Sequence, residues 1–113
     1  MMKCDTFSIQ IYSGLRVRHS GETYELQDVY DILQEYVDDV GLCVSVTPTT
    51  YVYTESGFEH GVVIGLINYP RFPSTVSELR VKATQIAEMV MNKLRQDRVT
   101  ICFPDYSITI GEE

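Results

Sequence analysis

The sequence lacks several features that define whole classes of protein. No run approaches the roughly 18 apolar residues of a membrane-spanning helix, and the N-terminal segment MMKCDTFSIQ has no apolar signal core. The three cysteines, Cys4, Cys43 and Cys102, are odd in number and widely spaced, so they do not indicate a disulfide framework. We therefore expect a soluble protein of a reducing compartment, with the cytoplasm as its default location and no contact with a membrane.

Positive charge is also scarce. Nine Lys and Arg residues face 16 Asp and Glu residues, which gives a net charge of −7. Binding to nucleic acid requires clustered cations that displace counterions from phosphates, so this balance argues against direct nucleic-acid binding. Because the acidic residues are scattered along the chain, we interpret them first as a solvated surface. The alternative is an acidic inhibitor of a nucleic-acid-binding protein.

The 113 residues, of which 44% are hydrophobic, are enough for one folded core. We expect a single α+β domain over residues 1–113. Apolar residues at spacings of three and four predict helices at 25–40 and at about 75–96. The second helix has the spacing of a capping box at its start, in Thr75 and Glu78.

Four segments show the patterns of strands. Residues 7–12 alternate strictly between apolar and polar side chains, as in a half-buried strand. Residues 42–54 are rich in Val, Thr and Tyr, and Pro48 within them favours an edge position. The segment VVIGLI, at 62–67, is apolar on both faces, which is typical of a central strand. Residues 98–103 complete the set, 106–110 are a possible short fifth strand, and 55–61 are expected to be a connection.

This order, strand-helix-strand-strand-helix-strand, predicts a ferredoxin-like βαββαβ two-layer sandwich with an antiparallel sheet in the order 4-1-3-2. The third strand is then central and the strand with Pro48 is at an edge, as their compositions require. Both helices cover one face of the sheet. The uncovered face should present Ser8, Gln10, Tyr12, Tyr51, Tyr53, Val63, Gly65 and Ile67.

That open face and the loop NYPRFP are the predicted interaction surfaces. Tyrosine suits an interface, because its ring buries area while its hydroxyl finds a hydrogen-bond partner. The prolines that stiffen NYPRFP reduce the entropy lost on binding, although Tyr69 and Phe72 could instead plug the end of the sheet. The expected interface residues are Tyr12, Tyr51, Tyr53, Tyr69, Arg71 and Phe72.

One end of the sheet is expected to bring together the ionisable side chains that could act in catalysis or ligand binding. His60 beside Glu59, with Glu55 nearby, could form a catalytic base oriented by a carboxylate. Neighbours in a strand point to opposite faces, however, so a solvated turn histidine is the alternative. A second group, Arg16, Arg18 and His19, could bind an anionic ligand, and Arg95 and Arg98 are expected at the same end.

Known catalytic and metal-binding signatures are absent from the sequence. It has no GxGxxG, Walker or HExxH motif, no paired cysteines and no GxSxG elbow. We therefore predict no cofactor and no metal.

The favoured function is a non-enzymatic binding or assembly protein. It would form a homo-oligomer through the open sheet face and hold a protein partner or a small anionic ligand at one loop end. The alternatives are a small hydrolase or phosphoryl-transfer enzyme with His60 as base, and the acidic inhibitor named above, so the sequence leaves open whether the protein is an enzyme.

Overall fold

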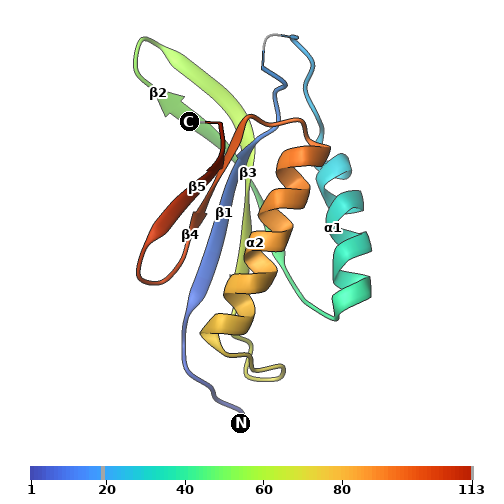
Figure 1. Cartoon of the computed structure of the whole chain (residues 1–113), viewed down its shortest axis with the longest axis vertical. Helices are drawn as coiled ribbons and strands as arrows, with labels where there is room; N and C mark the ends of the chain where they lie inside the picture. Colours follow the sequence, from blue (N-terminus) through green and yellow to red (C-terminus); the bar gives the residue numbers. More distant parts are fainter. Residues whose placement is uncertain (19, 113) are drawn as a thin grey trace.

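The computed structural model describes residues 1–18 and 20–112, and in them it shows a five-stranded sheet with two helices on one side (Figure 1). The strands lie in the order β2-β3-β1-β4-β5, and each neighbouring pair is antiparallel. The predicted α+β class, the ferredoxin-like order and the fifth strand are confirmed. The elements are β1 (Ser8–Gly14), α1 (Leu26–Val40), β2 (Ser45–Tyr53), β3 (Gly57–Ile67), α2 (Val76–Lys93), β4 (Arg98–Cys102) and β5 (Ser107–Gly111).

The connection between β2 and β3 is much shorter than predicted. We expected residues 55–61 to be a loop, but β3 already begins at Gly57. Glu55 and Ser56 both have positive φ, 62° and 60°, as the central residues of a mirror-image hairpin turn do. The composition of ESGFEHG is typical of a turn, but most of this segment belongs to the strand β3. The β2–β3 hairpin extends away from the helices (Figure 1).

The helices begin and end at recognisable caps. In α2, Thr75 Oγ1 accepts the Glu78 N–H at 3.1 Å, and the Glu78 carboxylate accepts the Thr75 N–H at 3.2 Å, so the predicted capping box is present. In α1, Gly41 has a φ of 69° and donates its N–H to the Val37 carbonyl, which ends the helix in the left-handed conformation that glycine adopts easily.

The hydrophobic core lies between the sheet and the helices. Ile9 and Ile11 of β1, with Val62, Ile64 and Leu66 of β3, are completely buried on the helix side. The helix α2 contributes Leu79, Ala83, Ile86, Ala87 and Val90. The central position predicted for VVIGLI is therefore confirmed, because β3 pairs with β1 along one edge and with β2 along the other.

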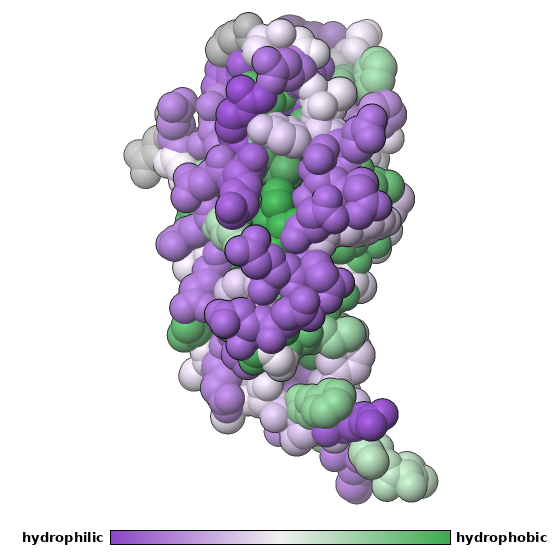
Figure 2. Space-filling view, turned by 90° about the vertical axis from the view of Figure 1, so that its right-hand side faces the viewer, coloured by the Kyte–Doolittle hydropathy of each residue, from purple (hydrophilic) through white to green (hydrophobic). Residues whose placement is uncertain are grey.

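The outer surfaces of the helices face solvent. Viewed from the side on which α1 lies, the surface is mainly hydrophilic, with a narrow hydrophobic strip near its middle (Figure 2). Within the described residues, neither helix is long and apolar enough to span a membrane.

Two isoleucines of β3 test the assignment of its two faces. Ile64 is completely buried against the helices, whereas Ile67 is 46% exposed. We expect Ile64→Ala to lower the free energy of unfolding by about 2–5 kcal/mol, because it removes buried methyl groups and leaves a cavity. The matched change Ile67→Ala should cost less than about 1 kcal/mol. Chemical denaturation measures both, and similar losses would contradict the assignment.

Candidate functional site

The open face of the sheet presents the side chains expected from alternation. The strand register places Gln10 beside Gly65 and Tyr12 beside Val63, and it places Tyr51 opposite Glu59 on the same face. None of these six residues lies in the buried core beneath the helices. The face is rich in hydroxyl groups and tyrosine rings. Tyr51 and Glu59 are the two residues on it whose side chains offer the most functional chemistry.

Tyr51 lies across three strands of the open face. Its hydroxyl donates to the Val62 carbonyl at 2.9 Å and to the Ser13 carbonyl at 3.3 Å. The ring passes so close to Gly61 that a Cβ there would overlap it. Glycine at this position therefore lets the ring lie against the sheet, and the two carbonyls fix the direction of the phenol.

Burial against the sheet favours the protonated form of the Tyr51 phenol. Burial raises the pKa of Tyr51 to about 12, with smaller contributions in the same direction from Tyr12 and Glu59, against the hydrogen bond to Ser13, which lowers it. At neutral pH the side chain is an uncharged ring that donates a hydrogen bond.

A cavity of about 310 Å³ opens at Glu59, the residue that pairs with Tyr51 in the strand register. The Glu59 carboxylate is one of its walls and lies close to Gly14, where a Cβ would come within 2.8 Å of Glu59 Oε2. Among residues 1–18 and 20–112, no side chain forms a hydrogen bond or an ion pair with this carboxylate. The residues that line the cavity are Gly14, Arg16, Arg18, Glu59, Gln96, Asp97 and Arg98.

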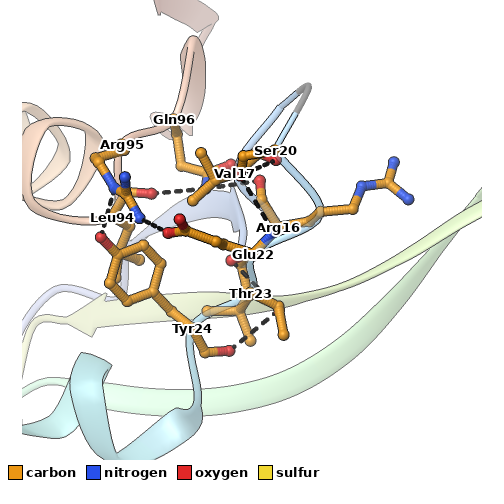
Figure 3. Close-up of polar contacts among 10 residues, drawn as sticks. Arg16, Val17, Ser20, Glu22, Thr23, Tyr24, Leu94, Arg95 and Gln96 are labelled. Carbon is orange, nitrogen blue, oxygen red and sulfur yellow. Dashed lines mark hydrogen bonds and ion pairs between the residues drawn. The ribbon is translucent and has the colours of Figure 1, made fainter.

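The β1–α1 loop is held against the corner between α2 and β4 (Figure 3). Gln96 Nε2 donates to the Arg16 carbonyl at 3.1 Å. Arg95 forms an ion pair with Glu22, and its Nε donates to the Tyr24 hydroxyl at 2.8 Å. These contacts fix the backbone from which the Arg16 side chain extends, away from the Arg95 network, as Figure 3 shows.

The three arginines of the cavity differ in their partners. Arg18 forms an ion pair with Asp97 at 2.9 Å. Arg16 donates to the Tyr53 hydroxyl at 3.2 Å, which is a neutral partner. Arg98 forms no ion pair with another described residue. The cavity therefore offers two guanidinium groups that have no carboxylate partner within the described part of the chain, together with the carboxylate of Glu59.

The structure does not bring the predicted catalytic residues together. His60 points to the helix side of β3, where its Nδ1 lies 3.2 Å from Thr50 Oγ1. Glu59 points to the open face, because successive residues of a strand alternate. Glu55 is exposed in the hairpin turn.

The predicted ligand-binding residues Arg16 and Arg18 do meet in the cavity, while His19 lies outside the described residues. Sequence reasoning missed Gln96 and Asp97. The signal for them was the topology, which already placed the loop after α2 at the same end as the loop after β1.

The predicted interface residues fall into two separate groups. Tyr12, Tyr51 and Tyr53 lie on the open face, whereas Tyr69, Arg71 and Phe72 lie at the opposite end of β3. The hydroxyl of Tyr69 is 3.7 Å from Cys43 Sγ, and this contact raises the pKa of Tyr69. Phe72 is 67% exposed, so the alternative in which it plugs the end of the sheet is wrong.

No group of three or more His, Cys, Asp or Glu side chains within the described residues is arranged to hold a metal ion. The carboxylate and the guanidinium groups of the cavity are instead suited to an organic ligand with charges of both signs.

Comparison with known proteins finds a likeness in structure. No protein-family model and no curated protein sequence matches the chain. A phage SAM lyase in complex with S-methyl-5'-thioadenosine superposes with a TM-score of 0.71 at 18% identity, over 100% of this chain and 95% of that one. A phage SAM lyase in the apo state superposes with a TM-score of 0.74 at 22% identity, over 95% of this chain and 90% of that one. At these identities the likeness shows a shared fold.

These matches overturn the function predicted from the sequence. Both similar structures are lyases, so the expectation of a non-enzymatic binding or assembly protein is wrong, as are its alternatives, the His60 hydrolase or phosphoryl-transfer enzyme and the acidic inhibitor. The physical reason is that an open sheet face with tyrosines looks the same in a sequence whether it holds a subunit or a small molecule. The predicted homo-oligomer and interface roles are not tested by these matches and stay predictions.

The close contact between Tyr51 and Gly61 yields a stability test. Gly61→Ala should lower the free energy of unfolding by about 1–3 kcal/mol, because the new methyl group displaces the ring or strains the strand. Gly65→Ala is the control, since a Cβ there would meet only the movable Ser45 hydroxyl, at 2.6 Å. Thermal or chemical unfolding compares the two, and a tolerated Gly61→Ala would show that the ring does not rest on this glycine.

The raised pKa of Tyr51 yields a test at alkaline pH. The folded protein holds this proton more tightly than the unfolded chain, whose tyrosines titrate near 10. The stability that Tyr51 contributes is therefore complete below pH 10 and is lost as the pH rises toward about 12. Ultraviolet absorbance should show one late-titrating tyrosine fewer in Tyr51→Phe, and the stability of that variant should fall less steeply over this range. Identical profiles would contradict the assignment.

Proposed function

We propose that the protein is a lyase that cleaves S-adenosylmethionine to S-methyl-5'-thioadenosine. The observation that carries this proposal is the full-length likeness to phage SAM lyase, one structure of which holds S-methyl-5'-thioadenosine. The geometry of the open sheet face suggests where the reaction would occur. The proposed site lies between Tyr51 and the cavity that contains Glu59.

The reaction is a cleavage at the sulfonium. The bond between sulfur and Cγ of the amino-acid part breaks, and its electron pair remains on sulfur, which becomes a neutral thioether. A lyase adds no water, so the four-carbon fragment has two routes. Either its own carboxylate oxygen bonds to Cγ and closes a lactone, or a proton leaves Cβ for a base and a double bond forms.

Both routes neutralise one positive and one negative charge. The sulfonium loses its charge as the bond breaks, and the attacking carboxylate or the base loses its negative charge as the new bond forms. Such a step is favoured where the reacting groups are partly removed from water and held among fixed dipoles. The half-buried open face beside the cavity provides surroundings of this kind.

Aromatic rings supply the binding surface for the nucleoside. The ring of Tyr51 is fixed against the sheet by its hydrogen bonds to backbone carbonyls. Tyrosine rings stack with planar bases and attract a cation over their faces. Tyr51, Tyr53 and Tyr12 are therefore the residues proposed to contact the adenosine and the sulfonium.

Glu59 is the proposed electrostatic partner of the substrate. Its carboxylate forms no ion pair within the described residues, it is half-buried, and it lies opposite Tyr51 in the strand register. A negative charge there attracts a cationic part of the ligand without having to release a protein partner. The small anionic ligand expected from the sequence is replaced in this proposal by a ligand with a carboxylate and two cationic centres.

The proposal predicts a specific product. Purified protein incubated with S-adenosylmethionine should release S-methyl-5'-thioadenosine, measured by liquid chromatography and mass spectrometry. Water labelled with heavy oxygen should leave no label in the amino-acid product as it first forms. Glu59→Gln should lower kcat/KM by about 10- to 100-fold, because it removes a charge-assisted contact.

Glu88→Gln provides the matched control for this loss. Glu88 is exposed on α2, on the other side of the sheet, so its variant should turn over at the wild-type rate. Absence of the thioether product would sink the proposed activity. If Glu59→Gln cleaves the substrate at the wild-type rate, Glu59 is not part of the site.

A further inference from the structure

We propose that Arg16 and Arg98 bind the α-carboxylate of the substrate while Glu59 binds its α-ammonium group, so that the cavity selects ligands with a free amino-acid end. This inference rests on the proposed function and assigns a part of the ligand to the cavity. It makes Arg16 and Arg98 specificity-determining residues.

The hydrogen bonds already formed indicate which arginines are available. Asp97 neutralises Arg18 at 2.9 Å, whereas the Arg16 guanidinium has, among residues 1–18 and 20–112, only the Tyr53 hydroxyl as a partner, at 3.2 Å. Arg98 has no ion pair within the described part of the chain. A guanidinium presents parallel N–H groups that match the two oxygens of a carboxylate, so the groups available in this cavity suit that anion.

The size of the cavity favours an amino-acid group over a whole nucleoside. Its volume of about 310 Å³ is at the lower limit of pockets for drug-sized ligands, which run from roughly 300 to 1,000 Å³. It is wide enough for a short zwitterionic chain. The nucleoside would then lie outside it, over the adjoining sheet face, where Tyr51 and Tyr53 present their rings.

The two arginines stand on well-fixed backbone. The carbonyl of Arg16 accepts the hydrogen bond from Gln96. Arg98 is the first residue of β4 and pairs with Gly111 of β5. Gly111 has a φ of 107°, and a Cβ there would overlap the Asp97 carbonyl, so β5 packs directly against this corner. Groups held on rigid backbone lose little freedom when a ligand binds.

The charge of the whole protein makes this arrangement unusual. The net charge is −7, and only six arginines are present, yet three of them line one cavity. Two carboxylates, Asp97 and Glu59, line the same cavity, so its three arginines leave one positive charge in excess (three minus two). A ligand whose anionic group needs local compensation gives the cluster a physical reason.

Two nucleosides that differ at the amino-acid end test the inference by isothermal titration calorimetry. S-adenosylhomocysteine has the end and an uncharged, uncleaved sulfur, whereas S-methyl-5'-thioadenosine has no amino-acid end. The wild-type protein should bind the first more tightly by about tenfold or more. Arg16→Gln and Arg98→Gln should each reduce this ratio severalfold and leave the Kd of S-methyl-5'-thioadenosine within about twofold.

Two further variants complete the test. Lys82→Gln, which removes a cation from α2 on the other side of the sheet, should leave both affinities unchanged. Arg16→Lys keeps the charge without the planar fork and should lose less than Arg16→Gln. If the arginine variants weaken both nucleosides equally, or leave the ratio intact, the inference is overturned while the proposed function stands. If the wild-type protein neither binds these nucleosides nor cleaves S-adenosylmethionine, the proposed function fails, and this inference fails with it.

Discussion

The structure depends on the central position of β3 and on its register. Paired with β1 on one edge and β2 on the other, this strand directs Val62, Ile64 and Leu66 into the core and turns Glu59 and Gly61 to the open face. A slip of one residue would exchange the two faces, so burial of the apolar set fixes the register. The same constraint separates Glu59 from His60, although they are adjacent in sequence.

Two glycines of the open face make room for the side chains of neighbouring strands. Gly61 lets the Tyr51 ring lie against the sheet, and Gly14 leaves room for the Glu59 carboxylate at the mouth of the cavity. Glycine within a strand costs about 0.5–1 kcal/mol relative to alanine. Here that cost is offset by the hydrogen bonds that Tyr51 makes to the Val62 and Ser13 carbonyls, so the open face gains a ring and a carboxylate with defined directions.

The sequence was sufficient for the fold and insufficient for the site. Local patterns predicted the strand order and one helix start correctly. These patterns are the apolar run VVIGLI, the position of Pro48 and the capping box. The Glu55–Ser56 turn was missed because two non-glycine residues rarely adopt positive φ together. The cavity was only partly anticipated, since it depends on which arginine pairs with Asp97, and that choice is made by tertiary packing between the β1–α1 loop and the α2–β4 corner.

The acidic surface and the arginine cavity are compatible once the charge of the proposed ligand is considered. S-adenosylmethionine carries a sulfonium, an ammonium and a carboxylate, so its net charge is positive, and a protein of net charge −7 attracts it from a distance. At close range Arg16 and Arg98 would orient the one anionic group of the proposed ligand, because screening limits the opposing field of the distant acidic residues. Cleavage would leave an uncharged thioether, which is attracted neither by the net charge of the protein nor by the arginines of the cavity. The same charge distribution would thus favour entry of the substrate and release of the nucleoside product.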